Sequence, residues 1–322
     1  MSKLLLGVDT SNYRTSLCLI DDQGNVVSEQ KQLLTVKQGE RGLRQSDAVF
    51  QHMIRLPELA SKLFYSGTLS AVAVSTRPRP IEGSYMPVFK AGESWAKGIA
   101  LFMNIPLFET SHQEMHIAAG EYSSHSRPQG EEFLAVHLSG GTSEILHCKR
   151  TGQGYQMKLL GGTRDLHAGQ LIDRIGVALG LPFPAGPYLE KLADTVQDDV
   201  LRVPTTTREY SFHLSGAETA LLRMIAEGKE SPAAIARATE QCIAGSLEKV
   251  IRYATQQGYP KEILIVGGVA ANSYIKKRLK HRLEHRAVGC SLYFADIAYS
   301  GDNAFGVARI GLNKWLKAND DI

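Results

Sequence analysis

Apolar and polar residues follow the same order in two distant segments of the chain. Residues 3–24 hold an apolar strand that ends at Asp9, a polar turn over 10–14 and a second strand over about 15–20. Residues 132–153 repeat this order, with a polar turn over 139–142. Alternation with a period of two, broken by turn residues, is the pattern of a β-hairpin. We therefore expect two hairpins whose tips carry hydroxyl groups or glycine.

A helical pattern and another strand follow each hairpin. A helix over about 47–63 precedes a strand over 69–75, and a helix over about 232–256 precedes a strand over 262–268. Switching between periods of 2 and 3.6 is typical of sheets covered by helices. The matching order predicts an α/β fold of two similar lobes that arose by duplication. The alternative is a chance likeness between two ordinary α/β halves.

Composition is consistent with two folded domains. The chain has 322 residues, of which 43% are apolar and 21% charged, and at roughly 150 residues per domain this predicts two. The net charge of +3 is too small to indicate a nucleic-acid partner by itself. Lysine and arginine are densest over 276–286, where a solvated helix face is the simpler interpretation than a binding patch.

Cysteine spacing and hydropathy favour the cytoplasm. The four cysteines lie far apart and form no C-x-x-C pair, so we interpret them as buried, reduced thiols (Cys18, Cys148, Cys242 and Cys290). The first residues are too short a run for a signal peptide. No apolar run reaches the roughly 20 residues that a membrane span needs. We expect a cytoplasmic protein without a membrane partner.

Glycine-rich turns at strand ends indicate a nucleotide. The turn 139–142 reads Ser-Gly-Gly-Thr, and 267–272 ends a strand and opens a basic helix. A phosphate reaches backbone N–H groups only where side chains are small, and a helix N-terminus adds donors. Asn272 either caps that helix or reaches a ribose or base. Singly these turns are weak signals, but their recurrence predicts a nucleotide in a cleft between the lobes.

A pair of histidines is a candidate metal site. His112 and His116 share one face of an expected helix, where two imidazoles chelate a single ion. Ser111 and Glu114 form the pattern of a capping box at the start of that helix. Asp302 lies in another strand-to-helix turn and is the candidate third ligand. This set suits iron or zinc, although ordinary surface or core histidines remain the alternative.

Taken together, the motifs resemble the TsaD/Gcp family, the catalytic subunit of tRNA threonylcarbamoyladenosine synthesis. The resemblance covers nearly the whole chain in order. Its motifs are LGGTRDLHAGQLIDRIGVALGLPFPAGPYLEKLA (160–193), VHLSGGTSEI (136–145), YSFHLSGAETAL (210–221), VGGVAAN (266–272) and YSGDNAFGVA (299–308). It implies a duplicated actin- and hexokinase-like fold. We expect an N-terminal lobe over 1–117, with a C-terminal helix (302–322) packing back on it, and a C-terminal lobe over 118–301.

The resemblance also implies a site. Its metal ligands are His112, His116 and Asp302, holding one divalent iron or zinc ion. The bound nucleotide is ATP or threonylcarbamoyl-AMP, contacted by His137, Leu138, Ser139, Gly140, Gly141, Asp173, Gly186 and Asn272. We take Asp9, Ser11 and Arg14 of the first turn as catalytic candidates. The implied partners are tRNA and the other subunits of a threonylcarbamoylation complex.

The chain departs from the family where substrate is expected. Tyr13 and Arg14 replace an acidic pair, Met115 stands where glycine is usual and Thr142 where histidine is usual. Further departures are Arg77-Pro78-Arg79-Pro80, the loss of a lysine in 215–219 and the stretch 39–52. We interpret the chain as a diverged paralogue that transfers threonylcarbamoyl from its adenylate to adenosine in tRNA. The alternatives are a nucleotide-binding regulatory or scaffold protein and a carbamoyltransferase acting on a small molecule.

Overall fold

The computed structural model describes residues 2–11, 13–36, 43–196 and 201–320. The chain divides into two compact units, described separately below. The first comprises 1–125, 150–156 and 296–322, and the second 126–149 and 157–295. The expected folding domains, with divisions after 117 and 301, stay a prediction. Part of the divergent stretch 39–52 lies outside the described residues.

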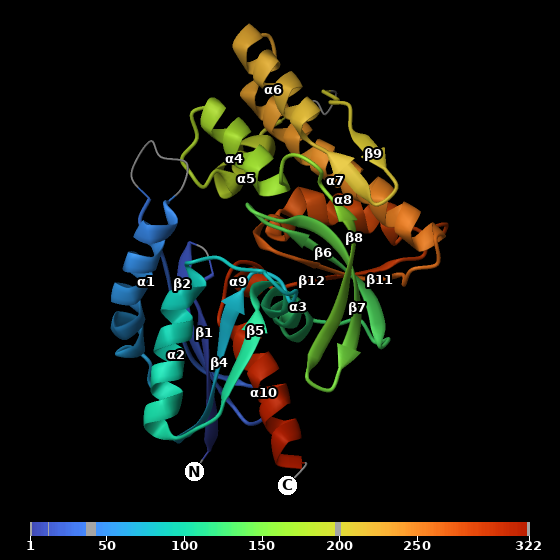
Figure 1. Cartoon of the computed structure of the whole chain (residues 1–322). Coiled ribbons are helices and arrows are strands. Elements are labelled where there is room, and N and C mark those ends of the chain that lie inside the picture. The colour runs from blue at the N-terminus through green and yellow to red at the C-terminus, as the bar shows by residue number, and fades with distance from the viewer. Residues whose placement is uncertain (1, 12, 37–42, 197–200, 321–322) are drawn as a thin grey trace. The chain divides into compact units, whose positions relative to one another are not determined.

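The first unit contains a five-stranded sheet in the order β3-β2-β1-β4-β5 (Figure 1). The first three strands are antiparallel neighbours, whereas β4 runs parallel to β1 and β5 parallel to β4. Every residue of β1 after Lys3 is buried, as expected of a central strand that is covered on both faces. The strands are β1 (Lys3–Asp9), β2 (Arg14–Asp21), β3 (Val26–Leu33), β4 (Thr68–Arg77) and β5 (Leu107–Ser111).

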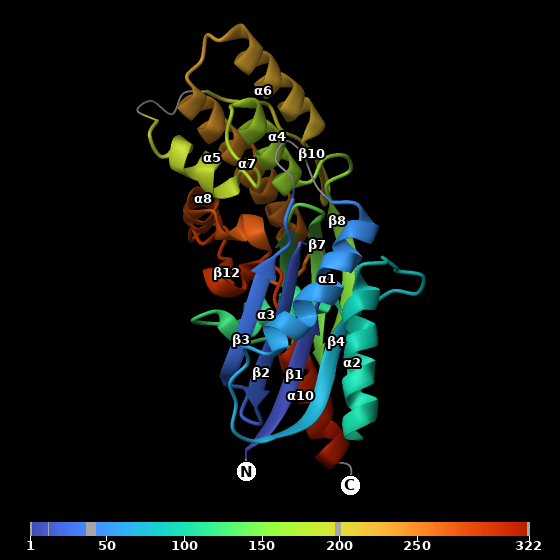
Figure 2. The ribbon, with the colours of Figure 1, turned by 90° about the vertical axis from the view of Figure 1, so that its left-hand side faces the viewer.

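Helices cover both faces of this sheet. Leu4, Leu6 and Val8 of β1 pack into one core with α1 and α2, whereas Leu5 packs into another with α3 and α10 (Figures 1 and 2). The alternation follows from the period of two along a strand. The helices are α1 (Gln45–Ala60), α2 (Phe89–Met103), α3 (His112–Ser123), α9 (Ile297–Ser300) and α10 (Phe305–Asp320).

The second unit repeats the strand order of the first. Its sheet runs β12-β11-β6-β7-β8, with β6 antiparallel to β7 and parallel to β11, and β11 parallel to β12. In chain order these five strands take the positions of β1 to β5, so the repeated arrangement predicted from the sequence is confirmed. The strands are β6 (Glu132–Leu138), β7 (Ser143–Thr151), β8 (Gly154–Gly162), β11 (Glu262–Val266) and β12 (Ser291–Phe294).

Helices and one large apolar core complete the second unit. The core joins Leu134, Val136 and Ile263 of the sheet to the buried sides of α4, α5 and α7. The remaining elements are α4 (Ala168–Ala178), α5 (Gly186–Ala193), β9 (Thr206–Arg208), β10 (Ser211–His213), α6 (Ser215–Glu227), α7 (Pro232–Gln256), the short 3₁₀ helix η1 (Gly268–Ala271) and α8 (Ser273–Leu283).

The basic run of the sequence forms α8 and the residues after it. Ile275, Leu279 and Leu283 face the core, and the lysines and arginines lie on the other sides. Arg282 and Arg278 pair with Glu248 of α7 at 3.0 and 3.9 Å. This is the charged outer helix face that the sequence predicts. All four cysteines are free and buried. Among the described residues, no helix is long and apolar enough to cross a bilayer.

Candidate functional sites in the two units

A capping box fixes the start of the helix that carries both histidines. The side chain of Ser111, at the end of β5, accepts a hydrogen bond from the backbone N–H of Glu114 at 3.2 Å, and the Glu114 carboxylate accepts one from the Ser111 N–H at 2.9 Å. This confirms the predicted cap. His112 is the first residue of α3, and His116 follows one turn later on the same side. The cap therefore sets the direction of both imidazoles.

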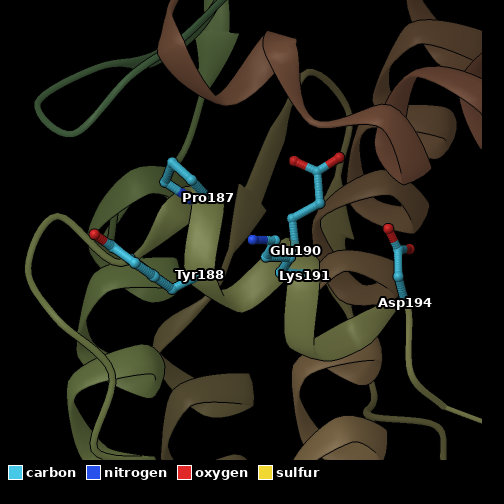
Figure 3. A pocket seen from close by; sticks show the side chains of 5 residues that line it. All are labelled: Pro187, Tyr188, Glu190, Lys191 and Asp194. Atoms are coloured by element: carbon cyan, nitrogen blue, oxygen red, sulfur yellow. The ribbon is translucent and has the colours of Figure 1, made fainter.

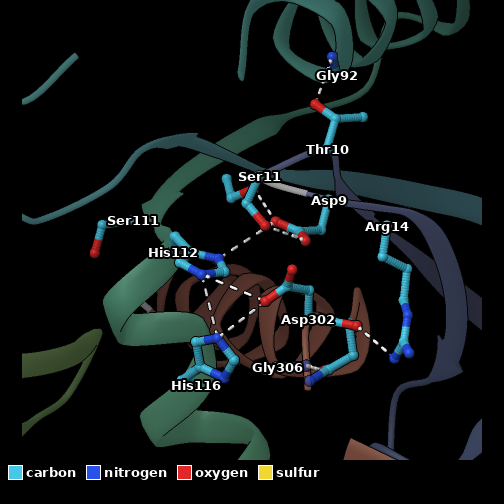
Figure 4. A network of polar contacts seen from close by, with 12 residues as sticks. Asp9, Thr10, Ser11, Arg14, Gly92, Ser111, His112, His116, Asp302 and Gly306 are labelled. Atoms are coloured by element: carbon cyan, nitrogen blue, oxygen red, sulfur yellow. Dashed lines mark hydrogen bonds and ion pairs between the residues drawn. The ribbon is translucent and has the colours of Figure 1, made fainter. Parts of the chain in front are cut away.

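Three side chains of the first unit form a compact set of metal donors (Figure 4). The two Nε2 atoms of His112 and His116 lie 3.2 Å apart. Oδ1 of Asp302 lies 3.6 Å from the first and 3.4 Å from the second. A tetrahedral ion with bonds near 2.05 Å needs donors about 3.3 Å apart. The three atoms match one face of such a coordination shell, so the group can hold a metal ion.

The loop that supplies Asp302 is held by its neighbour in sequence. Asn303 is fully buried, and its amide donates to the carbonyl oxygens of Tyr299 and Gly301 at 3.0 and 2.8 Å. Its side-chain oxygen accepts from the N–H of Gly306 at 3.0 Å. A Cβ at Gly306 would lie 2.1 Å from the Met115 carbonyl oxygen. Glycine there lets α10 touch α3 and brings Asp302 to the histidines.

Met115 thus has a packing role at its divergent position. Its side chain is fully buried in the core with α10. Nothing in the structure directs this side chain at the three metal donors. This departure from the family pattern lies in the core and not among the metal ligands.

Asp9 lies behind the metal group as a second carboxylate. It is fully buried and accepts hydrogen bonds from the hydroxyl groups of Ser11, at 2.7 Å, and Ser75. Its Oδ1 lies 4.0 Å from Nδ1 of His112, an electrostatic contact on the side of the ring away from Asp302. Burial is the main cause that raises the pKa of Asp9 to about 6. The 4.0 Å distance between Asp9 and His112 is longer than a hydrogen bond, so Asp9 acts on the His112 ring through its charge.

The donor group is electrostatically prepared for a cation. Burial alone would raise the pKa of Asp302, but the hydrogen bond with His116 and the charge of His112 outweigh it and lower this pKa to about 2. Burial also lowers the pKa of His116. An ionised carboxylate and a neutral imidazole are the forms that bind metals.

Arg14 touches the metal loop from its main-chain side. The residue begins β2, and its Nη1 donates to the carbonyl oxygen of Asp302 at 3.2 Å (Figure 4). The nearby Thr10 accepts a hydrogen bond from the N–H of Gly92 in α2 at 3.0 Å. The first turn therefore brings Asp9, which Ser11 bonds, beside His112 and bonds Arg14 to the main chain of Asp302.

In the second unit, the turn after β6 presents main-chain groups. A hydrogen bond from the Ser139 N–H to the Thr142 carbonyl oxygen, at 2.7 Å, joins the two ends of the turn. The Gly169 N–H donates to the Ser139 carbonyl oxygen at 3.2 Å. A Cβ at Gly140 or at Gly141 would meet no atom within 4 Å. Gly169, by contrast, packs directly against the turn, because a Cβ on Gly169 would lie 2.7 Å from the Gly140 nitrogen. The turn is held from one side and open at its glycines.

The other predicted residues of the second unit lie at the end of β6, in α4, at the start of α5 and at the N-cap of α8. His137 and Leu138 end β6 and are buried. Gly267, with φ +95°, passes so near that a Cβ would lie 2.2 Å from the Leu138 carbonyl oxygen, which brings the 267–272 turn beside β6. Asp173 accepts from the Ala185 N–H at 2.7 Å, directly before Gly186 and the start of α5. Burial raises the pKa of Asp173.

An open pocket lies along α5 (Figure 3). Its lining residues share that helix and its C-cap: Pro187, Tyr188, Glu190, Lys191 and Asp194. Two of them have partners elsewhere in the second unit. Glu190 accepts hydrogen bonds from the N–H of Ser273 at 2.7 Å and from its hydroxyl at 2.5 Å, and Asp194 accepts from Arg237 at 2.7 Å.

Asn272 caps α8, the first of the two roles weighed from the sequence. Its Oδ1 accepts from the Ile275 N–H at 2.9 Å, and its Nδ2 donates to Glu240 at 2.6 Å. Sequence reasoning missed Glu240, and it also missed Ser75 and Asn303. Ser75 and Glu240 bond to partners far away in the chain and leave no local pattern. Asn303 was readable in principle, because it is a cap residue immediately after Asp302.

Comparisons of the sequence with known proteins identify one family. The family model "tRNA N6-adenosine threonylcarbamoyltransferase" matches residues 24–309. A protein of that name from Thermus thermophilus is 30% identical over 97% of this chain and 92% of its own length. Another from Methanopyrus kandleri is 27% identical over 96% of this chain and 87% of its own.

Solved structures support the fold at lower identity. The ADPNP-bound activator of 2-hydroxyisocaproyl-CoA dehydratase from Clostridium difficile superimposes with a TM-score of 0.56 at 12% identity, over 99% of this chain and 98% of that one. T. kodakarensis HypF gives 0.59 at 15% identity, over 98% of this chain and 48% of its own. With the repeated sheets, these neighbours confirm the duplicated actin- and hexokinase-like fold. The match of the family model over most of the chain and the 30% identical relative show that the chain belongs to the tRNA N6-adenosine threonylcarbamoyltransferase family.

Proposed function

We propose that the protein transfers a threonylcarbamoyl group from threonylcarbamoyl-AMP to N6 of an adenosine in tRNA. The donor is a mixed anhydride. The adenine amine attacks its carbonyl carbon, the bond from that carbon to the phosphate oxygen breaks, and AMP leaves while the amine loses a proton. The products are a urea linkage on the base and free AMP. Family membership supports the type of reaction, and the residues below support the way this chain performs it.

The observation that carries the proposal is the triangle formed by His112, His116 and Asp302. Its donor–donor distances of 3.2, 3.4 and 3.6 Å suit a single divalent ion, with coordination positions left for a substrate oxygen. Iron and zinc both accept two imidazoles and a carboxylate. The ion, when bound, would supply a Lewis acid for phosphate or carbonyl oxygen. Asp9 would place a second negative charge beside the His112 ring, on the side away from Asp302.

The second unit would hold the nucleotide. A Cβ at Gly140 or Gly141 would meet no atom within 4 Å, so the turn leaves room for a phosphate beside its glycines. The Gly141 N–H, which donates to the Ser139 hydroxyl at 3.3 Å, would exchange that bond for one to the phosphate. His137, Leu138 and Ser139 would shape the base of that turn. Asp173, Gly186 and Asn272 would contact the nucleoside part. ATP and threonylcarbamoyl-AMP share the adenosine and the α-phosphate, so both fit this assignment.

Partners and location follow from the same proposal. The acceptor is tRNA, and an adenylate-forming protein must supply the mixed anhydride, because this chain is assigned only the transfer step. We propose further subunits of a threonylcarbamoylation complex as partners and the cytoplasm as the location.

The test is reconstitution of the modification. Purified protein is incubated with ATP, threonine, bicarbonate, an adenylate-forming partner and unmodified tRNA, and the nucleosides are analysed by mass spectrometry. The expected product is N6-threonylcarbamoyladenosine, formed by the wild type and by a His147→Ala control. His147 is a histidine of β7 that pairs with Glu132 at 3.0 Å. A His112→Ala/His116→Ala variant should form none.

Absence of the modified nucleoside in the wild-type reaction, with ATP still bound, would contradict transfer to tRNA. Arg14 then gives weight to a second candidate, carbamoyl transfer to a small molecule. A cation stands there in place of an acid of the family pattern, which changes the charge offered to an acceptor. Adding small carbamoyl acceptors to the same reaction and searching for new products by mass spectrometry tests this candidate.

A further inference from the structure

Both ends of the Asn272 amide are occupied by the protein. The oxygen caps α8 through the Ile275 N–H at 2.9 Å, and the nitrogen donates to Oε1 of Glu240 at 2.6 Å. A carboxylate only accepts hydrogen bonds and a backbone N–H only donates, so the amide has a single orientation that satisfies both partners. One N–H and one oxygen lone pair are left over, and their directions are fixed.

Glu240 is an unusual residue for its place in the fold. It lies in the middle of α7 and is fully buried, where an unpaired carboxylate would be costly. Its second oxygen accepts from Nη1 of Arg237 at 2.5 Å, one turn earlier on the same helix. Both oxygens are therefore committed, one to a cation and the other to Asn272.

Arg237 extends this connection to α5. Its Nη2 donates to Asp194 at 2.7 Å, and its guanidinium lies over the Tyr274 ring, 4.0 Å from the centroid. A parallel link runs from Glu190 to Ser273. Asp194 and Glu190 line the α5 pocket of Figure 3, so two links tie the pocket helix to the N-terminus of α8.

We propose that Glu240 is a positioning residue for adenine nucleotide binding, which fixes the Asn272 amide, and that Arg237 in turn fixes Glu240. The proposal rests on the proposed function, in which Asn272 contacts the nucleoside. Glu240 touches no substrate in this account. It acts by making one orientation of Asn272 the stable one before the nucleotide arrives, so binding does not have to select it.

Replacing Glu240 by glutamine tests this directly. Glutamine has one acceptor oxygen, yet both Arg237 and Asn272 present donors. Because Arg237 is charged, its hydrogen bond to the glutamine oxygen is the stronger one and is kept. The glutamine NH₂ then faces the NH₂ of Asn272. Asn272 must flip and lose its cap or keep an unsatisfied contact. In the double variant Arg237→Met/Glu240→Gln, no arginine competes for the glutamine oxygen, so this oxygen accepts the hydrogen bond from Asn272.

Glu248 is the matched control. It lies on the same helix, is also buried, and pairs with Arg282 at 3.0 Å, but it bonds to none of the residues near Asn272. ATP affinity is measured by titration calorimetry at a pH well above the Glu240 pKa of about 7, so that its carboxylate is ionised. Wild type, Glu240→Gln, Glu248→Gln and the double variant are compared, with thermal unfolding alongside. We expect about tenfold weaker ATP binding for Glu240→Gln, the scale of one buried hydrogen bond.

Glu248→Gln should bind ATP within twofold of the wild type even if its melting temperature falls. The double variant should recover part of the affinity lost in Glu240→Gln. Equal affinity changes in the two single variants, or additive losses in the double variant, overturn the positioning role while leaving the proposed function intact. A wild-type protein that binds no ATP overturns the nucleotide part of the proposed function, and this inference with it.

Discussion

The turn after β1 and the turn after β6 occupy equivalent places in two sheets of the same strand order, yet they carry opposite chemistry. The first begins with a buried carboxylate, Asp9, beside His112. The second consists of main-chain groups around Gly140 and Gly141, with open space where side chains would be. The first end carries donors that could hold a cation, and we propose that the second accepts the phosphate of the nucleotide.

The difference lies in what the neighbouring elements contribute. In the first unit, a helix capped at Ser111 brings imidazoles to the strand end. In the second, Gly169 lets the start of α4 come within contact distance of the turn. Topology fixes where a strand ends, and a few residues on adjacent helices decide which ligand that end accepts. The repeated strand order thus provides two equivalent positions that carry different residues.

Removing the imidazoles should have the largest effect on this contrast. Four-ligand zinc sites bind with about 10–16 kcal/mol, or about 3 kcal/mol per ligand, so His112→Ala/His116→Ala should weaken metal binding by more than about a thousandfold. Metal content after dialysis, read by mass spectrometry, is the measurement. A His147→Ala variant should retain its metal. Unchanged metal content in the double variant would remove the cation site from the comparison.

Glu240, the buried acid that bonds to Asn272, should make the free energy of unfolding depend on pH. Burial chiefly raises the pKa of Glu240 from 4.5 to about 7, so folding favours its protonated form. That stabilisation is complete below pH 4.5 and is lost as pH rises through 7, an effect of about 3 kcal/mol at most. Relative to Glu240→Gln, the wild type should therefore lose unfolding free energy between pH 5 and pH 8.

Urea unfolding of both proteins across that range measures the difference. Glu248→Gln serves as the reference for a buried glutamate on the same helix. A wild-type minus Glu240→Gln difference that stays flat with pH would show that Glu240 remains ionised throughout.

Asp9 tests whether the first turn belongs to the metal group. Loss of an outer-shell carboxylate typically weakens metal binding 10- to 100-fold, and we expect this for Asp9→Asn. Asp21→Asn, at the far end of β2, changes the same residue type in a hairpin turn of the same unit and should leave metal affinity unchanged. Isothermal titration with Zn²⁺ compares the two. Equal affinities would assign Asp9 to the core alone.

Substitution of Gly140 should have the smallest effect of these variants, and it should affect ATP binding but not melting temperature. A Cβ at Gly140 meets nothing within 4 Å, so Gly140→Val should fold with little change in melting temperature. Its side chain should obstruct the phosphate and weaken ATP binding by about tenfold, about 1.4 kcal/mol. Gly216→Val, equally open at the start of α6, should bind ATP normally. Normal binding by Gly140→Val would place the phosphate elsewhere.

The features that the sequence predicted correctly are those that depend on local patterns. The hairpins, the capping box at Ser111 and the basic helix α8 all rest on residues close in sequence, and all were confirmed. Asp302 was a candidate because it lies in a strand-to-helix turn, and the order of the family motifs then strengthened that assignment. The bonds from Ser75 to Asp9, from Arg14 to the Asp302 carbonyl and from Asn272 to Glu240 link distant segments. Hydropathy carries no information about such pairs, because each partner also suits an ordinary strand or helix.

The contact of α10 with α3 at Gly306 affects the order of events during synthesis. The first sheet is translated early, but α10, which covers one of its faces, is made after the whole of the second unit. On the ribosome, the second unit has all its strands before the first can bury its last face. The triad of His112, His116 and Asp302 is therefore completed only after the second unit has been translated, and metal uptake would report that α10 has packed on the first sheet.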